Sequence, residues 1–292
     1  REGIQLYTGY KRGSTRLNSE FKIKDKIKVG EHLNVSFSNA KSGNEIQNAM
    51  RSSPLIPTYD NNGDFAGTYS NSFGLGNARS PLARLYRTKD NYNKSLAIFG
   101  DVYMMADLYE GLTFKTTLSG RMEANDTRSF NYLDPEHGEA VSTNTLTEGD
   151  FTSYEWSWSN TLNYSKDFGE HSINALVGIE AIKGGQKGKG ISRTGYLFET
   201  PDFYLLNNGS GTPNVAWAYD GSNSLYSFFG TTNYSYQGKY FATATVRYDK
   251  SSRFSGDNKS DIFPSFSAGW LLSKEDFFPK DAVVSRLKLK AS

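Results

Sequence analysis

Short segments in which apolar and polar residues alternate recur along most of the chain. Between Tyr240 and Asp249 the even-numbered residues form an apolar face with a tyrosine at each end, Tyr240 and Tyr248, and the odd-numbered residues form a mainly polar face. Side chains alternate across a β-strand, so the pattern predicts a strand with one apolar surface. Tilted by about 40°, such a strand separates the two tyrosines by roughly 20 Å, close to the roughly 25 Å apolar band of an outer-membrane barrel. A soluble β-sandwich strand also alternates, so this segment alone favours neither.

The same alternation predicts about ten strands and no convincing helix. Residues 1–15 are polar and contain glycine, and they are predicted to form a loop, whereas residues 283–290 alternate as the last strand. The clearest strand covers residues 153–165, and four of its aromatic residues share the apolar face: Tyr154, Trp156, Trp158 and Tyr164. These rings could stack on sugars, but a face shared with leucine favours contact with lipid or an aromatic girdle.

The predicted connections alternate between short and long. The short connections are at 25–31, 109–111, 166–171, 237–239 and 273–282, and the longer ones are at 39–92, 124–150, 183–223 and 250–261. Outer-membrane barrels combine short periplasmic turns with long extracellular loops, whereas the Greek-key connections of a sandwich would not keep every long loop on one side. The sequence therefore predicts an all-β fold, a transmembrane antiparallel β-barrel. Polar inward positions indicate a wet or plugged lumen, so about ten strands are expected to be part of a larger barrel.

Composition narrows the alternatives. The chain has 292 residues, of which 37% are hydrophobic and 14% aromatic, with no cysteine and a net charge of +2. No run of about 18 apolar residues predicts a spanning helix, which a membrane barrel does not need. The charge gives no reason to bind nucleic acid, and the absence of cysteine removes disulfides and thiolate sites. Without an initial methionine and ending within a strand pattern, residues 1–292 are expected to be an internal part of one barrel domain.

Candidate sites for metal, phosphate or catalysis are weak, and no cofactor is expected. His32, His137 and His171 are far apart in the sequence and are interpreted as solvated turn residues. Residues 60–64 (DNNGD) fit an Asn/Asp/Gly turn better than a calcium loop, since the terminal glutamate of an EF-hand is missing. The glycine cluster at 184–190 lacks the strand–loop–helix context of a phosphate loop.

The segment at 246–278 (VRYDKSSRFSGDNKSDIFPSFSAGWLLSKEDFF) closely resembles the signature hairpin of the SusC/RagA family, the TonB-dependent outer-membrane transporters of Bacteroidota. In that family a strand ends in R-x-D-x-SSRF, and the next opens with FPS-x-S-x-GW before an E-x-F turn. The matching residues are Arg247, Asp249, Ser251, Ser252, Arg253, Phe254, Phe263, Pro264, Ser265, Ser267, Gly269, Trp270, Glu275 and Phe277. The segment at 54–67 also resembles the family. Arg247 and Asp249 could contact ligand, the plug or each other, and a structural ion pair inside the barrel is favoured. Arg253 and Phe254 are interpreted as residues that anchor the following loop.

The resemblance implies a barrel of about 22 strands with a plug inside. It also implies a SusD-like surface lipoprotein over the extracellular mouth, TonB on the periplasmic side, and oligosaccharides, peptides or similar nutrients as ligands. The plug, TonB box and final strands have no counterpart in this sequence. Substrate contacts are expected in the loops at 39–92, 124–150 and 183–223. The alternatives are an outer-membrane barrel enzyme of the lipase or protease type, which would need a nucleophile and a base on neighbouring strands, and a secreted β-sandwich adhesin or carbohydrate-binding module.

Overall fold

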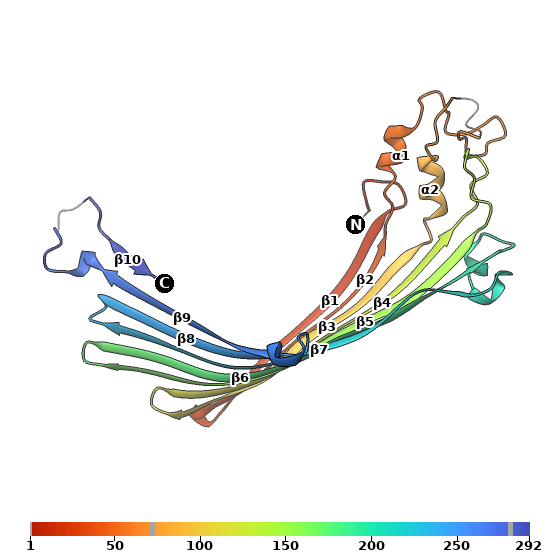
Figure 1. The fold of residues 1–292 in the computed structure, drawn as a ribbon. Helices are drawn as coiled ribbons and strands as arrows, with labels where there is room; N and C mark the ends of the chain where they lie inside the picture. Colours follow the sequence, from red (N-terminus) through yellow and green to blue (C-terminus); the bar gives the residue numbers. More distant parts are fainter. Residues whose placement is uncertain (1, 70–73, 280–282) are drawn as a thin grey trace.

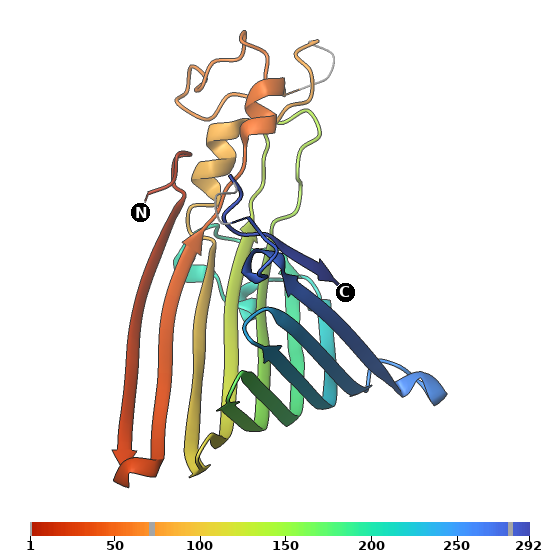
Figure 2. The same ribbon diagram turned by 90° about the vertical axis from the view of Figure 1, so that its left-hand side faces the viewer.

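The computed structural model describes residues 2–69, 74–279 and 283–292, and they form one antiparallel sheet whose strands follow one another in chain order. The sheet is an open, strongly curved trough (Figures 1 and 2). The strands are β1 (Gly9–Ile23), β2 (Ile27–Lys41), β3 (Tyr92–Tyr109), β4 (Leu112–Asn131), β5 (Thr145–Phe168), β6 (His171–Thr194), β7 (Asn214–Tyr236), β8 (Tyr240–Ser251), β9 (Ser260–Leu271) and β10 (Lys288–Ala291). A β-sandwich would need two packed sheets, so the all-β prediction of a barrel wall is confirmed and the sandwich alternative is wrong.

Tight turns connect the strands at one end of the sheet. The β5–β6 turn and the β7–β8 turn each use glycine in the left-handed region, with φ of 59° at Gly169 and 57° at Gly238. At the β7–β8 turn Gln237 also has a positive φ of 55°, so two consecutive residues occupy the left-handed region, as in a type I′ turn. These turns gather along one rim of the sheet, at the left-hand ends of the strands in Figure 1.

Longer connections leave the other end, so the predicted alternation is confirmed, but two of the loops are much shorter than predicted. Residues 132–144 and 195–213 connect β4 to β5 and β6 to β7, where the sequence indicated loops at 124–150 and 183–223. The strands β5 and β6 are each 24 residues long, whereas about 9–11 residues cross a bilayer. The extra length continues as strand with polar residues on both faces, and for this reason it resembled loop in the sequence.

The glycine cluster at 184–190 lies within strand β6. Glycine suits these positions because aromatic rings occupy the space that larger side chains would fill. A Cβ atom on Gly185 would lie 2.7 Å from the hydroxyl of Tyr154, and one on Gly190 would lie 2.3 Å from the indole nitrogen of Trp217. Gly188 would also meet the Trp217 ring, at 2.9 Å. The glycines therefore allow large rings to lie flat on the sheet, and the prediction of a loop here is wrong.

The longest connection, residues 42–91, contains two short helices that the sequence analysis did not predict. These are α1 (Ile46–Arg51) and α2 (Pro81–Arg87). Ser80 caps α2 by accepting a hydrogen bond from the backbone N–H of Ala83, and Pro81 occupies the first turn, where its missing N–H costs nothing. Residues 70–73 of the predicted loop at 39–92 lie outside the described residues. No helix among the described residues is long and apolar enough to cross a membrane.

The two ends of the chain also differ from the predictions. Residues 9–15, predicted as loop, belong to β1, which pairs with β2 from Gly9↔Lys41 to Ile23↔Ile27. The last strand, β10, is shorter than predicted, and Val283 is fully exposed before it begins. The connection from β9 to β10 starts with the 3-10 turn η6 (Leu272–Lys274), and residues 280–282 of the predicted 273–282 turn are outside the described part.

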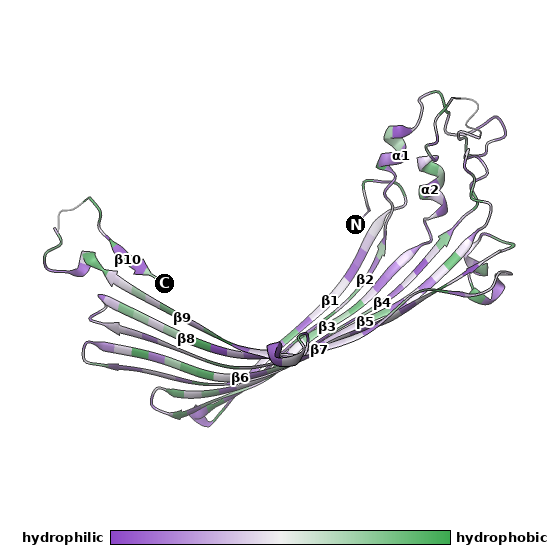
Figure 3. Ribbon diagram, in the orientation of Figure 1, coloured by the Kyte–Doolittle hydropathy of each residue, from purple (hydrophilic) through white to green (hydrophobic). Residues whose placement is uncertain are grey.

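The register divides the sheet into two faces. One side of the sheet, which we call the apolar face, carries a row across β4 to β8 made of Leu118, Trp158, Ala181, Tyr226 and Lys250. The opposite side, which we call the polar face, carries the neighbouring row of Thr117, Ser159, Glu180, Ser227 and Asp249. Figure 3 shows the resulting alternation of hydrophobic and hydrophilic residues along the strands. Large side chains on the apolar face are exposed; Trp158 is 49% and Phe228 54% accessible. A wide apolar surface of this kind is not stable in water and indicates a lipid or protein environment.

Candidate functional site

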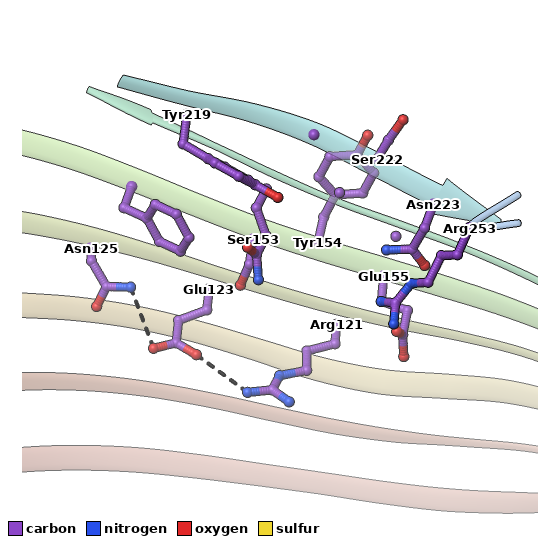
Figure 4. Close-up of a pocket in the computed structure, with 15 residues that line it drawn as sticks. Arg121, Glu123, Asn125, Ser153, Tyr154, Glu155, Tyr219, Ser222, Asn223 and Arg253 are labelled. Atoms are coloured by element: carbon purple, nitrogen blue, oxygen red, sulfur yellow. Dashed lines mark hydrogen bonds and ion pairs between the residues drawn. The ribbon is translucent and has the colours of Figure 1, made fainter. Parts of the chain in front are cut away.

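A polar cleft of about 670 Å³ lies on the polar face, across β4, β5, β6 and β7. Figure 4 shows its residues, which include Arg121, Glu123, Asn125, Ser153, Tyr154, Glu155, Tyr219, Ser222, Asn223 and Arg253. Its two arginines and two glutamates balance in charge, and the amide and phenol groups add hydrogen-bond donors and acceptors. A volume of this size suits a small molecule or one segment of a longer chain.

Some of the charged groups in the cleft are already paired and others are not. Glu123 accepts hydrogen bonds from Arg121, at 3.3 Å, and from Asn125, at 3.4 Å. Glu155 lies directly across from Arg121 in the register, yet its carboxylate forms no ion pair with any described residue. The guanidinium of Arg253 also has no ion-pair partner in the described part of the chain. One carboxylate and one guanidinium therefore remain available to a ligand. Arg121, Glu123 and Glu155 were not predicted as site residues; their alternation on one face was the available signal.

Arg247 is held by groups of the barrel wall. Its Nε donates to both carboxylate oxygens of Asp249, at 2.7 and 2.9 Å, and its Nη2 donates to the hydroxyl of Ser227 at 2.8 Å. Glu180 lies 3.6 Å from the same Nη2, and the ring of Phe229 packs at 5.5 Å from the guanidinium carbon. The ion pair predicted from the motif therefore forms, and the Nε and Nη2 donors of Arg247 are already used within the barrel wall.

The serines of the SSRF motif hold the β8–β9 loop, whereas the predicted anchors do not. Ser252 exchanges two hydrogen bonds with the backbone of Ser224, at 2.8 and 2.9 Å, and Ser251 accepts from the backbone N–H of Arg253. Phe254 is 61% exposed, and the side chain of Arg253 extends over the polar cleft (Figure 4). The expectation that Arg253 and Phe254 anchor the loop is wrong, because short hydroxyls next to the backbone perform that role.

The second half of the motif organises the end of the sheet where the tight turns lie. Glu275 accepts a hydrogen bond from the indole of Trp270 at 2.9 Å and pairs with the ammonium of Lys239 at 3.2 Å. Trp270 also stacks on Tyr240 at 6.2 Å and meets Phe277 edge-on at 6.3 Å. These contacts join the β7–β8 turn to η6.

The space beside the backbone explains the glycine of the motif. A Cβ on Gly269 would lie 2.9 Å from Lys288, whose ammonium lies 3.7 Å from the centre of the Phe241 ring. Pro264 pairs with Val246 of β8. Phe263, Ser265 and Ser267 fall on the polar face of the same strand, opposite Arg247, Thr245 and Thr243.

The turn network predicts a response to acid. Hydrogen bonds from Trp270, from Tyr240 and from Lys239 lower the pKa of Glu275 below its ordinary value of 4.5. A lowered carboxyl pKa contributes stability that is present above the unfolded-state pKa and is lost as the pH falls through the folded-state pKa. The protection factors of the backbone amides at residues 237–240 and 270–275, which are corrected for the intrinsic slowing of exchange in acid, are therefore expected to fall below about pH 4.5. Glu275→Gln should show low protection factors already at pH 7 and change little with acid; an identical acid response in both proteins would contradict this role.

Of the aromatic residues singled out in the sequence, Tyr154 borders the polar cleft, whereas Trp156, Trp158 and Tyr164 are not among its lining residues. Tyr154, Trp156, Trp158 and Tyr164 project from the apolar face of β5 and are each 37–49% exposed. Trp158 donates from its indole N–H to Thr116 at 3.0 Å. Near the tight turns, Tyr240 stacks between Tyr236 and Trp270, while Tyr248 lies toward the other end of β8, opposite Phe228.

The three histidines do not meet, but one of them is not a solvated residue. His137 is 4% exposed, and its two ring nitrogens lie 2.9 Å from the carbonyl oxygens of Asn77 and Glu139. His32 contacts Asp101 at 3.0 Å, and His171 contacts the hydroxyl of Tyr234 at 2.6 Å. The prediction for His137 is wrong because a distant loop covers it, which no local pattern reveals. No group of metal-ligating side chains occurs in the described ranges.

The DNNGD segment forms the predicted turn. The carboxylate of Asp60 accepts from the backbone N–H groups of Asn62, at 2.8 Å, and Asp64, at 3.0 Å. Gly63 has a φ of 86°, which favours glycine. The carboxylate is therefore used by the turn itself.

Two loops above the sheet combine into one unit, which we call the loop cap, made of residues 42–69, 74–91 and 132–144. Arg87 at the end of α2 forms a two-fold ion pair with Glu136, at 2.6 and 3.0 Å, and Glu136 is 5% exposed. The hydroxyl of Thr68, itself fully buried, accepts from the backbone N–H of Gly138. Arg79 lies 3.5 Å from Asp134. Nothing in the sequence joined these residues, because they are about 50 or more positions apart.

A third loop, residues 195–213, packs against the second. Tyr204 stacks on Phe130 at 4.2 Å, and its hydroxyl contacts that of Tyr132. Burial raises the pKa of Tyr204, so the phenol stays protonated. Asn144 donates to the carbonyl of Tyr196 at 2.9 Å and accepts from its backbone N–H at 2.7 Å. The loops at this end of the sheet are therefore held in place by buried contacts, not by the strands alone.

Comparisons with known proteins agree with the architecture. No family model matches the sequence. TonB-dependent receptor P26 of Formosa agariphila is 28% identical over all of this chain and 29% of its own length, and receptor P3 of the same organism is 30% identical over 86% of this chain and 24% of its own length. TonB-dependent receptor SusC of Bacteroides thetaiotaomicron is 28% identical over 89% of this chain and 27% of its own length. The chain thus spans less than a third of the curated relatives that it matches.

Solved structures give the same fold. The RagAB peptide importer in its open-open state superposes with a TM-score of 0.77 at 24% identity, covering 97% of this chain and 32% of that one. The ferripyoverdine receptor of the outer membrane of Pseudomonas aeruginosa superposes with a TM-score of 0.56 at 12% identity, covering 92% of this chain and 35% of that one. The signature hairpin, the single meandering sheet and these relatives agree. The chain belongs to the SusC/RagA family of TonB-dependent receptors and is a part of their outer-membrane β-barrel.

Proposed function

We propose that the chain is part of the wall of an active importer that moves oligosaccharides, peptides or similar nutrients across the outer membrane. In this proposal the apolar face contacts lipid and the polar face lines the lumen. The observation that carries it is the separation of the two faces: exposed aromatic and aliphatic residues on one side, and on the other a cleft that contains an unpaired carboxylate and guanidinium. A barrel wall in a bilayer needs both surfaces.

The energy for import is proposed to come through TonB from the proton gradient of the inner membrane, since the outer membrane holds no ATP. A SusD-like surface lipoprotein is the proposed partner above the loops. The relative SusC is named a TonB-dependent receptor, and the structural neighbour RagAB is described as a peptide importer. Both support transport, and neither supports the rival of a barrel enzyme.

The loop cap and the polar cleft have different proposed roles. The cap is built around buried ion pairs, so its internal surfaces are already occupied, and ligand contact is assigned to its outer surface. The cleft offers free hydrogen-bonding groups below it. Glu155 is proposed to accept from hydroxyl or ammonium groups of the nutrient, and Arg253 to donate to carboxylate or hydroxyl groups.

Removing the two unpaired groups tests the proposed role of the cleft. Glu155→Ala with Arg253→Ala should lower uptake of labelled oligopeptide or oligosaccharide mixtures by roughly tenfold or more, because hydrogen bonds to charged groups contribute about 1.5–3 kcal/mol each. Barrel folding should not change, since neither group has an ion-pair partner among the described residues. Uptake into cells that express the intact transporter is the measurement, normalised to its amount in the outer membrane.

A matched control removes one acid and one base at the other end of the sheet. Glu110→Ala with Lys166→Ala changes two exposed residues near the tight turns and should leave uptake unchanged. Dissipating the proton gradient should abolish uptake in every variant. Uptake that continues without the gradient would contradict active import, and equal loss in both double variants would contradict the cleft as the contact site.

A further inference from the structure

The glycine-rich segment of β6 places three lysines on one side of the sheet. Lys183, Lys187 and Lys189 are exposed and lie on the same side as the apolar face, while the buried Gly188 and Gly190 lie on the opposite side beneath Trp217. The alternation of a strand therefore separates the segment into a row of ammonium groups and a flat surface for an aromatic ring.

The row of lysines lies where the apolar face ends. Lys183 is opposite Trp156, and Tyr154 packs over Gly185, so these two rings mark the aromatic level. Lys187 and Lys189 continue beyond it by two and four residues, which places them about 5 and 10 Å above Tyr154 in a tilted strand. That is the depth at which lipid headgroups lie if the apolar face contacts lipid, so this inference rests on the proposed orientation of the barrel.

A hollow of about 620 Å³ lies at this position, between β5, β6 and β7. Lys187 and Lys189 line it together with Tyr154, Asp150 and Asp220. Lys187 is 3.6 Å from Asp220, an exposed pair, whereas Lys183 and Lys189 have no ion-pair partner among the described residues. Within the hollow the ammonium group of Lys189 is thus available to an anion, Lys187 can exchange its exposed contact with Asp220 for one, and the two aspartates limit how strongly an anion is attracted. Lys183 lies outside the hollow, beside Trp156.

We propose that this hollow binds the phosphate group of a lipid headgroup in the outer leaflet of the membrane. A lipid is favoured over a soluble anion because the lysines adjoin the apolar face, so acyl chains can lie on Trp156 and Trp158 while the phosphate reaches the ammonium groups. Lysine side chains extend from an apolar surface to a polar boundary in this way. Their attraction to an anionic surface adds to the contact of the acyl chains.

Native mass spectrometry of the intact transporter in detergent micelles tests the site. The purified protein is titrated with bisphosphorylated lipid A and, separately, with dephosphorylated lipid A. The variant K183Q/K187Q/K189Q should bind the phosphorylated lipid about tenfold more weakly and the dephosphorylated lipid equally well. The variant D150N/D220N should bind the phosphorylated lipid more tightly than the wild type. Inorganic phosphate in large excess should not displace the lipid.

A control removes three lysines from the polar face: K22Q/K28Q/K115Q should leave lipid binding unchanged. The inference would be overturned if the control variant lost lipid binding to the same extent, or if the wild type bound both forms of lipid A equally well. Displacement of the bound lipid by inorganic phosphate would overturn it too. The proposed function is tested separately. If K183Q/K187Q/K189Q inserts, imports and binds the phosphorylated lipid as well as the wild type does, the lipid site is contradicted and the proposed function is not. A wild-type protein that fails to insert with its apolar face in lipid contradicts the orientation on which both depend.

Discussion

Replacing Ile179 with arginine is expected to impair insertion of the barrel by about 2–4 kcal/mol, the cost of an arginine on the lipid face near the bilayer midplane. Ile179 lies on the apolar face opposite Asn160, close to the middle of the interval between Tyr154 and Tyr164 on β5. It is 36% exposed in the isolated sheet, so a guanidinium there would face lipid without a carboxylate partner in the register, where its neighbours are Asn160 and Phe228. The measurement is folding of the intact transporter into vesicles, followed by its heat-modifiable migration in gels.

The matched control places the same arginine on the opposite face at the same depth. Ser159→Arg points to the polar face, where Glu180 is its direct neighbour in the register and can pair with it. This variant should insert like the wild type. Val177→Arg should have a smaller effect than Ile179→Arg, because Val177 pairs with Leu162 nearer the tyrosine at the turn end. Equal damage from Ile179→Arg and Ser159→Arg would contradict the assignment of the two faces.

Replacing Arg87 with leucine is expected to destabilise the loop cap by about 3–5 kcal/mol, because it leaves the buried carboxylate of Glu136 without its partner. The side chain of Glu136 is 6% exposed and that of Arg87 19%, so water cannot replace the lost contacts at low cost. Hydrogen exchange of the intact protein should show loss of protection at residues 65–69 and 134–139, with β5 and β6 unchanged.

Two further variants distinguish the ion pair from a general effect of the substitution. Arg51→Leu in α1 of the same loop removes one exposed hydrogen bond to Asn77 and should cost less than about 1 kcal/mol. The double variant Arg87→Leu with Glu136→Leu should recover most of the protection, since an apolar pair often replaces a buried ion pair without loss. If Arg87→Leu and Arg51→Leu exchange alike, the buried pair does not hold the cap.

The membrane-spanning part of the sheet could be predicted from the sequence because its physical constraint is local. Lipid on one side and water on the other impose strict alternation, and this is why the two faces of β5 and β8 were assigned from residues 153–165 and 240–249. The signature residues were also recognisable, although the structure changes their interpretation. Ser252 and Glu275 carry hydrogen bonds that hold turns together, while Arg253 extends over the cleft.

Beyond the membrane the same reasoning fails. Strands β5 and β6 continue beyond the membrane, where both faces of the sheet meet water. The alternation of apolar and polar residues is lost there, and the glycines at 184–190 resemble a loop. Their role depends on Tyr154 and Trp217 lying over them, which is a contact between strands. His137 and the pair of Arg87 with Glu136 depend on how two loops meet, and neither spacing nor composition encodes that contact. Long-range packing of side chains therefore sets the limit of prediction here.

The orientation of the wall is tested most directly by a cysteine scan, for which the chain is suited because it has no cysteine of its own. Single cysteines at each position from 153 to 164 in the intact transporter would carry a spin label in vesicles, with collision rates measured for oxygen, which partitions into lipid, and for a water-soluble nickel complex. The account predicts a period of two, with positions 154, 156, 158, 160, 162 and 164 favouring oxygen and the intervening positions favouring the nickel complex. A uniform profile, or one with the two sets exchanged, would contradict it.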